Sequence, residues 1–439
     1  MMSRWRWLLT LTSRKLWLRV SAMALIGVVT AVAGIVLAPY VPNNWTIKIG
    51  AKAIDGILNV LASSMLAVTV FSLSTMVAAY GAATNNVTPR ATKLLMEDNT
   101  SQNVLGTFIG SFLFSLVGII ALSTGAYGDQ GRAVLLIVTI GLIALIAITI
   151  LRWIDYLARF GRLGETIQRV EDATWKAMEM RLTQPHLGGR PMLSEAPETA
   201  WPVFAKSIGY VQHIDIAAIQ EWAAKEDREV FVMALPGVFA DPARPVAMVS
   251  GLDDKSVGKA IAEAFTVGEE RTFDQDPRFG LCVLAEIASR ALSPAVNDPG
   301  TAIDVVGRGV RLLAQWVRFD STKIKTEIEC SNVRVPSIKI GDMLDDIFSP
   351  IERDGAGLIE IQLRLQKAFI ALLAANHDAF ASAVREHSAT ALMRADVALQ
   401  LENERIAVRT IASKVTQITI PEGAYFLGQG GGSKSIAPR

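Results

Sequence analysis

Cysteine and histidine are scarce in this chain. Its 439 residues include only two cysteines, Cys282 and Cys330, and four histidines. Two isolated cysteines give no disulfide framework and are typical of a reducing compartment. The histidines lack metal-type spacing, and no P-loop, dinucleotide fingerprint or nucleophile elbow is present. The sequence therefore predicts no enzyme, no cofactor and no metal site.

Net charge is also nearly absent. The 43 basic and 42 acidic residues leave a formal charge of +1, so no global field would attract nucleic acid. Charged residues are missing from four long apolar runs, which raise the mean hydropathy to +0.34. A bilayer core needs about 20 apolar residues per helix. We therefore predict a transmembrane domain over residues 20–152, with spans at about 20–38, 57–80, 104–126 and 133–151.

Lysine and arginine near these spans lie mostly on one side of the membrane. They gather before the first span, between the second and third, and after the fourth. Because such residues favour the cytoplasmic side, both termini are predicted to be cytoplasmic. Residues 1–19 mix arginine with Trp5, Trp7 and Trp17, which predicts an interfacial segment in contact with the lipid bilayer.

Small hydroxyl residues punctuate the second and third spans. Their spacing puts them on helical faces, and Gly106 and Gly110 form a GxxxG motif that favours helix packing. The hydroxyls either pack helices together or line a hydrated pathway for ions or small solutes. No charged residue lies within the spans, which argues against a proton-coupled pump but not against a passive pore. The candidates for pore lining or helix packing are Ser64, Ser72, Thr75, Thr107, Ser111 and Ser115.

The remainder reads as an α+β cytoplasmic domain that is mostly helical. We predict an amphipathic helix and linker at 153–200, a small β-containing subdomain at 201–252, a helical domain at 253–420 and a flexible tail at 421–439. The β element resembles a biotinyl/lipoyl-like half-barrel, because a "PG-x-F" turn at Pro236 lies between two apolar segments. No Met-Lys pair is present, so a swinging-arm role is not expected.

The most distinctive run is "RTFDQDPRFGLCVLAEIASRALSPAVNDPGTA". Asp276 before Pro277, and Asn297 or Asp298 before Pro299, are typical helix caps. The alternative is a polar cluster of Asp274, Asp276, Asn297 and Asp298 that binds a cation or another ligand. Capping explains all these residues and is the favoured interpretation.

This run, together with "FSLSTMVAAYGAATNNVTPRATKLLMEDNTSQNVLGTFIGSF", resembles the bacterial predicted membrane proteins called domain of unknown function 2254. The resemblance covers nearly the whole chain. It implies a bacterial inner-membrane protein and assigns no activity and no functional residues.

Two hypotheses about function follow. The first is a homo-oligomeric, channel-like protein in which spans two and three line a pathway and the cytoplasmic domain assembles or gates it. The alternative is a membrane-anchored sensor or scaffold whose cytoplasmic domain binds a ligand or a protein. The first requires the hydroxyls to face water, and the second does not.

Overall fold

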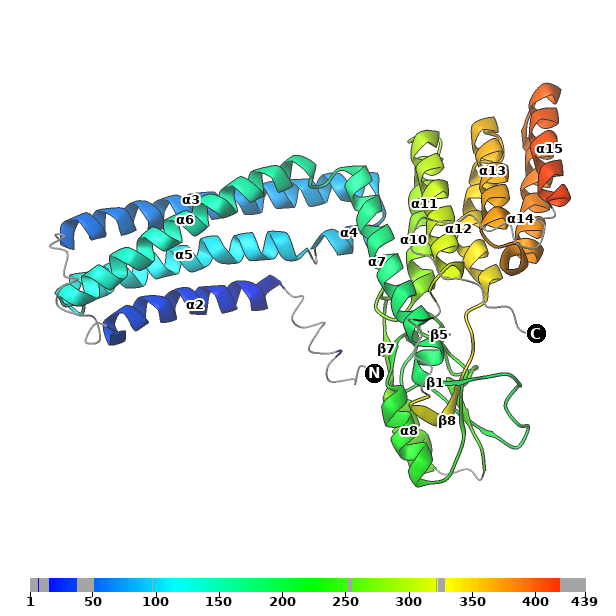
Figure 1. Ribbon diagram of the computed structural model, residues 1–439, viewed down its shortest axis with the longest axis horizontal. Helices are drawn as coiled ribbons and strands as arrows, with labels where there is room; N and C mark the ends of the chain where they lie inside the picture. Colours follow the sequence, from blue (N-terminus) through cyan, green and yellow to red (C-terminus); the bar gives the residue numbers. More distant parts are fainter. Residues whose placement is uncertain are drawn as a thin grey trace, which may run out of the picture. The chain divides into compact units, whose positions relative to one another are not determined.

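The chain folds into two compact units that divide within one helix. A computed structural model describes residues 7, 16–37, 51–96, 98–251, 255–320, 322 and 328–418 (Figure 1). The N-terminal unit ends at Arg169 and the C-terminal unit begins at Val170. The predicted interfacial segment 1–19 lies largely outside the described residues, and the predicted tail 421–439 lies wholly outside them.

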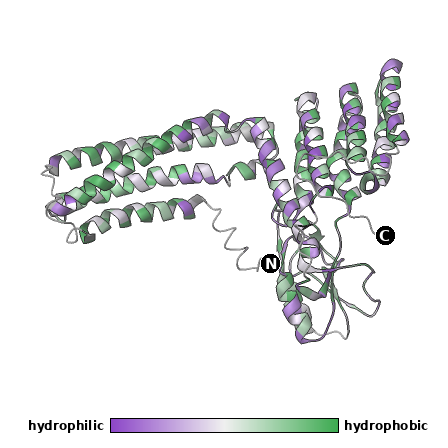
Figure 2. Cartoon of the chain, in the orientation of Figure 1, coloured by the Kyte–Doolittle hydropathy of each residue, from purple (hydrophilic) through white to green (hydrophobic). Residues whose placement is uncertain are grey.

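The N-terminal unit is a helical bundle. In the described part of the chain, four of its helices are long and apolar enough to cross a membrane, and Figure 2 shows hydrophobic residues along most of their length. Helix α5 is central, because it packs against the three other long helices. The helices are α2 (Leu16–Leu37), α3 (Ala51–Asn86), the short α4 (Pro89–Met96), α5 (Asn99–Ser123) and α6 (Asp129–Arg159).

The predicted spans fall on these helices, with one difference at the end of the third. The span predicted to reach residue 126 stops earlier, since α5 ends at Ser123 with Thr124 as its C-cap. Gly125 then adopts a φ of +71°, and the Ala126 N–H donates to the Ala121 carbonyl at 3.0 Å. This is the left-handed termination that glycine permits after a helix.

The amphipathic helix predicted at the start of residues 153–200 is not one helix, because its first residues belong to α6. Helix α6 ends at Arg159 and α7 (Leu163–Thr183) begins three residues later. Gly161 lies between them with a φ of +76°. A Cβ there would lie 3.2 Å from the Ala79 carbonyl oxygen, so glycine allows both the turn and the close approach to α3.

The described strands of the C-terminal unit form two β-sheets. In the larger sheet, β8 pairs in parallel with β1 and β4, whereas β6 pairs antiparallel with β4 and β2. The smaller sheet is antiparallel. The larger has the order β1 (Gly189–Pro191), β8 (Cys330–Val335), β4 (Val230–Val232), β6 (Ala247–Val249) and β2 (Trp201–Val203). The smaller has the order β5 (Phe239–Ala240), β3 (Gly209–Ile214) and β7 (Phe265–Gly268).

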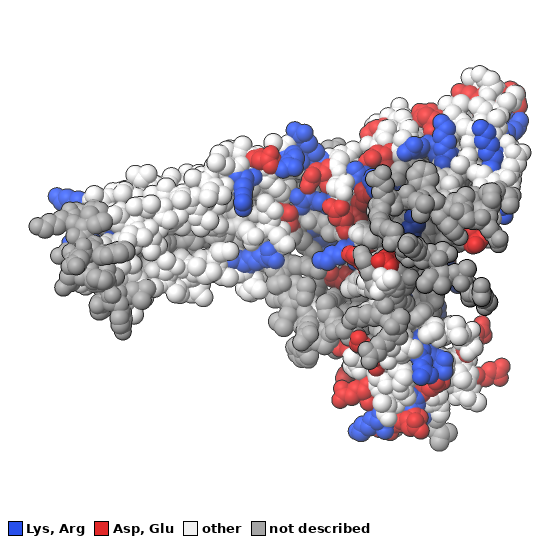
Figure 3. Space-filling model, viewed as in Figure 1, with Lys and Arg blue, Asp and Glu red and all other residues white. Residues whose placement is uncertain are grey.

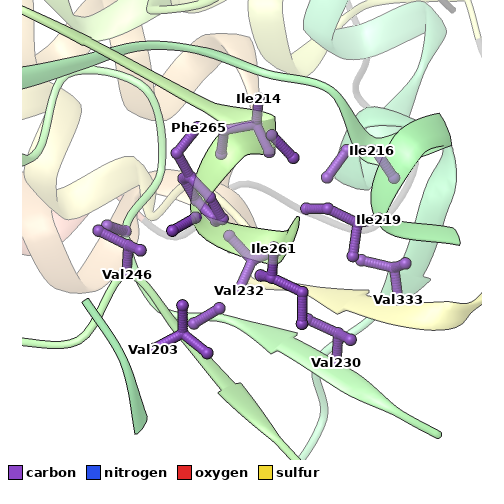
Figure 4. Close-up of a cluster of buried hydrophobic side chains, with 14 of the residues drawn as sticks. Val203, Ile214, Ile216, Ile219, Val230, Val232, Val246, Ile261, Phe265 and Val333 are labelled. Atoms are coloured by element: carbon purple, nitrogen blue, oxygen red, sulfur yellow. The ribbon is translucent and has the colours of Figure 1, made fainter. Parts of the chain in front are cut away.

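An aliphatic core joins these sheets to α8 (Ile216–Lys225) and α9 (Lys255–Ala264). Figure 4 shows Ile219 of α8, Ile261 of α9 and Val232 of β4 converging in it. The predicted linker contains regular structure, namely the 3-10 turn η3 (Pro185–Gly188) and strand β1, and it ends where β2 begins. The biotinyl/lipoyl-like half-barrel stays a prediction.

In the part of the chain that the structure describes, six further helices of the C-terminal unit stack as three hairpins, with β8 between the first hairpin and the second. One layer contains α10, α12 and α14, and the other contains α11, α13 and α15 (Figure 1). This is the arrangement of an α-solenoid. The helices are α10 (Pro277–Ala291), α11 (Pro299–Val317), α12 (Ile340–Asp354), α13 (Ile359–Ala375), α14 (His377–Ala398) and α15 (Glu402–Gln417).

A buried polar link joins two hairpins of this stack. Glu352 on α12 is fully buried, and its Oε1 lies 2.7 Å from His387 Nδ1 on α14. Arg394 Nη1 lies 3.4 Å from the other carboxylate oxygen. Since a buried carboxylate must be paired, these contacts fix the register of α14 on α12.

Candidate functional site

The predicted hydroxyl residues lie mainly inside the N-terminal bundle. Ser72, Ser111 and Ser115 are each at most 1% exposed. The Trp153 indole of α6 donates to Ser72 Oγ at 3.0 Å, and Ser115 Oγ donates to the Ser111 carbonyl at 2.9 Å. Ser111 Oγ donates to the Thr107 carbonyl at 2.6 Å, so all three hydroxyl groups contact atoms of this chain.

The other three predicted hydroxyls are half-buried and bond to their own helices. Ser64 Oγ donates to the Leu61 carbonyl at 3.2 Å, and Thr75 Oγ1 donates to the Phe71 carbonyl at 2.8 Å. Thr107 Oγ1 donates to the Asn103 carbonyl at 2.9 Å. Such bonds satisfy a hydroxyl in lipid without water.

The two predicted packing glycines lie where α5 meets α2. A Cβ on Gly110 would be 2.8 Å from the Met23 carbonyl oxygen, and one on Gly106 would be 3.0 Å from Met23 Cγ. Gly27 of α2 faces the Gly110 carbonyl in turn. The GxxxG motif thus brings two backbones together within one protomer.

The four residues of the predicted polar cluster do not form one site. Asp276 caps the start of α10, whereas Asn297 and Asp298 follow its end, so a 15-residue helix of about 22 Å separates them. Asp298 Oδ1 accepts from the Thr301 N–H at 3.1 Å as the cap of α11. Among the described residues, no group of three or more His, Cys, Asp or Glu side chains could hold a metal ion. The capping interpretation is confirmed for Asp276 and Asp298.

A cavity of about 280 Å³ in the C-terminal unit includes Asp276 in its wall. Four segments enclose it: the end of α7, the turn after β4, the approach to α10 and the approach to α12. Its lining is Arg181, Met233, Leu235, Pro236, Gly237, Val238, Arg271, Gln275, Asp276, Pro277, Arg278, Pro336, Ser337, Ile338 and Asp342. The distinctive run "RTFDQDPRFG" thus supplies a large part of the wall.

Asp276 organises one side of the cavity. Its Oδ1 accepts from the backbone N–H groups of Arg278 at 3.2 Å and Phe279 at 3.1 Å. Its Oδ2 accepts from Arg271 Nε at 2.8 Å. Burial raises the pKa of Asp276 above its usual range, and Arg271 opposes this rise. Burial alone would lower the pKa of Arg271, but its hydrogen bond with Asp276 raises it.

The "PG-x-F" turn is shaped to accommodate this carboxylate. Gly237 has a φ of +95°, and a Cβ on it would overlap the Asp276 carboxylate. The turn therefore requires glycine both for its backbone conformation and for its closeness to Asp276.

Arg278 connects α10 to α12 beside the cavity. Its guanidinium donates to both Asp346 oxygens, at 2.6 and 3.1 Å, and to Asp342 Oδ2 at 2.9 Å. These forked bonds use its planar geometry. The Arg278 guanidinium therefore holds α10 and α12 together.

Arg181, near the end of α7, uses only part of its hydrogen-bonding capacity. Arg181 is 6% exposed, and its Nη2 donates to the Pro336 carbonyl at 3.3 Å. Its Nη1 is buried without a hydrogen-bond partner among the described residues. Burial lowers the pKa of Arg181 to about 10, and Asp276 partly offsets that effect. The side chain stays charged at neutral pH, and one of its donor groups lacks an acceptor.

Sequence reasoning found part of this site. Asp276 is predicted as a helix cap or a ligand-binding residue, and Arg271 and Arg278 lie in the same distinctive run. Arg181 carried no signal, because it looks like any basic residue in the last turn of an amphipathic helix. Its distance of 95 positions from Asp276 hides their proximity.

Comparisons with known proteins establish the family. The model of the predicted membrane protein family DUF2254 matches residues 13–371, so the chain belongs to this family. That range includes every residue lining the cavity. Uncharacterized proteins of Mycobacterium tuberculosis and Mycobacterium bovis are 26% identical to it over 262 residues, which cover 57% of this chain and 50% of theirs. The chain spans about half the length of these curated relatives. No solved structure matches.

Proposed function

We propose that this protein is a membrane-anchored sensor whose C-terminal unit binds a small ligand in the Arg181–Asp276 cavity. The observation that carries the proposal is the cavity itself, with its buried, unmatched guanidinium donor. Sites for small molecules are concave, mostly apolar and equipped with a few placed polar groups. The helical bundle acts as the anchor.

A cytoplasmic position of the C-terminal unit in a bacterial inner membrane is part of this proposal. The distribution of lysine and arginine around the apolar runs supports it. Figure 3 displays many charged side chains over the C-terminal unit and few along the apolar helices, which fits exposure of the first to water and of the second to lipid.

Binding without chemistry fits the side chains of the cavity. Asp276 already accepts three hydrogen bonds, which leaves it poorly placed as a general base. Burial raises the pKa of the nearby Cys282 thiol to about 12, so it is protonated at neutral pH and a poor nucleophile. A sensor is therefore favoured over an enzyme.

A channel-like pathway in a homo-oligomer stays a prediction with weaker support. It relied on hydroxyls facing water, yet Ser72, Ser111 and Ser115 are buried inside one protomer. Their bonds to Trp153 and to the backbone of α5 fit close packing in lipid instead.

The test is thermal unfolding of the full chain in lipid nanodiscs with a collection of small metabolites. Ser337 lines the cavity, so Ser337→Trp places a bulky side chain at its wall. Ser331→Trp is the matched control, since Ser331 is exposed on β8 and does not line it. A ligand at 100 times its Kd stabilises the folded state by about 2.7 kcal/mol.

We expect at least one compound to raise the Tm of the wild type and Ser331→Trp but not of Ser337→Trp. The proposal fails if no compound stabilises the wild type. It also fails if every stabilising compound acts equally on all three proteins.

A further inference from the structure

The charges around the cavity define a class of ligand. We infer that the cavity takes a small organic anion, a carboxylate or a phosphate monoester, whose charged end binds Arg181 and the first turn of α12. This inference rests on the proposed function and adds to it the chemistry of the ligand.

Arg181 supplies the first recognition group. Its Nη1 is buried without an acceptor among the described residues, and a buried unpaired donor on a charged group is costly. The Asp276 carboxylate accepts from Arg271 and from two backbone N–H groups and makes no hydrogen bond with Arg181 Nη1. A ligand oxygen would provide the missing acceptor.

The start of α12 supplies a second set of donors. This 15-residue helix follows Lys339, whose side chain makes no capping hydrogen bond. The first-turn N–H groups of a helix have no partner within it and carry partial positive charge. Asp342 lies in this turn and Ser337 and Ile338 precede it, so the start of α12 forms part of the cavity wall. Arg278 holds the Asp342 carboxylate at 2.9 Å, which leaves the first-turn N–H groups available to an anion.

The charge balance favours an anion as well. Three arginines line the cavity, and two of them are paired with aspartates: Arg271 with Asp276, and Arg278 with Asp342 and Asp346. Arg271 and Arg278 are held by aspartates at 2.8 Å and 2.9 Å. Among the described residues, Arg181 is therefore the lining arginine that has no carboxylate within ion-pair distance.

Apolar side chains explain why the ligand is organic. Met233, Leu235 and Ile338 line the same cavity, and they would contact the body of a molecule whose acid group reaches Arg181. The volume of about 280 Å³ is just below the usual range of ligand pockets, about 300 to 1,000 Å³, so the ligand is small. A bare inorganic ion would leave this apolar wall without a partner.

The test compares acids with neutral molecules of the same shape on the full chain in a phosphate-free detergent. The pairs are butyrate with butyramide, glycerol phosphate with glycerol, and phosphatidic acid vesicles with diacylglycerol vesicles. The first two pairs probe soluble acids and the third probes a lipid headgroup. Ionic strength is held equal with sodium chloride, and the apparent Kd is taken from the rise in Tm.

The decisive variant is Arg181→Met, with Arg190→Met as its control, because Arg190 is exposed and does not line the cavity. We expect at least one acid to bind the wild type and Arg190→Met. We expect its Kd for Arg181→Met to rise roughly tenfold or more, since a hydrogen bond to a charged group is lost. If Arg181→Met does not fold, Arg181→Lys keeps the charge without the forked geometry and should show a smaller rise.

Two results would overturn the inference and are distinguishable. If neutral molecules bind as well as their acids and Arg181→Met changes nothing, the inferred ligand class is wrong. The proposed function would still hold in that case, provided that Ser337→Trp abolishes the binding. If no acid binds while uncharged compounds stabilise the protein, the anion assignment fails alone. If no compound of any charge stabilises it, the proposed function fails too.

Discussion

Arg271 Nε lies 2.8 Å from Asp276 Oδ2, and the same carboxylate caps α10 through its other oxygen. One side chain thus starts a helix and neutralises a guanidinium that packs 5.1 Å from the Phe279 ring. This relationship connects the local signal in the sequence to the wall of the cavity.

Asp276→Ala should destabilise the C-terminal unit far more than Asp298→Ala. Both residues are N-caps, but Asp298 is only a cap. Loss of a cap costs about 1 kcal/mol, whereas removing one partner of a buried ion pair costs about 3–5 kcal/mol. Urea unfolding of the full chain, followed by tryptophan fluorescence, measures both variants. Equal losses would show that the Arg271 pair contributes little.

Gly110→Ala should disrupt the packing of α2 on α5. The new methyl group would lie 2.8 Å from the Met23 carbonyl oxygen, whereas Gly141 of α6 has nothing within 4 Å. Overpacking costs about 1–3 kcal/mol, while alanine gains up to about 1 kcal/mol over glycine in a helix. Thermal unfolding in nanodiscs should therefore give a lower Tm for Gly110→Ala and an unchanged or higher Tm for Gly141→Ala. A neutral Gly110→Ala would rule out close helix contact there.

Ser72→Leu should destabilise the bundle of a single protomer. It removes the acceptor of the Trp153 indole N–H and adds volume at a fully buried position. An unsatisfied buried donor costs about 1–3 kcal/mol. Ser74→Leu is the control, because Ser74 is exposed two residues away. Tm and mass in nanodiscs report both effects. Normal stability of Ser72→Leu combined with blocked ion flux would instead support the pathway.

Cys282 should be unreactive in the folded protein and should make stability fall at high pH. Burial raises its pKa from 9.0 to about 12. Between these values the unfolded state binds fewer protons than the folded state, so the free energy of unfolding falls as pH rises. We expect a smaller loss for Cys282→Ala than for the wild type as the pH rises from about 9 to about 11. Rapid alkylation of Cys282 in the folded protein at neutral pH would contradict this.

Features governed by local chemistry could be predicted from the sequence. The starts of α10 and α11 follow from Asp276-Pro277 and Asp298-Pro299, because a cap and a proline act over three residues. The membrane helices follow from composition alone. The break at Gly161 could not be predicted from the sequence, since a glycine within an amphipathic pattern is usually tolerated in a helix.

Features that depend on distant segments could not be predicted. Strands β1 and β8 pair across about 140 positions, and a three-residue strand has no readable periodicity. Arg181 meets the approaches to α10 and α12 only in the folded unit. The burial of Ser72 likewise depends on Trp153, a residue of another helix.

Hydrogen exchange of the full chain in nanodiscs, with and without a small-molecule extract of bacterial cells, tests the central claim most directly. If the cavity is the functional site, protection should rise in residues 271–278 and 336–342 of the wild type and stay unchanged there in Ser337→Trp. Protection that rises only within α3 and α5, or nowhere, would contradict the account.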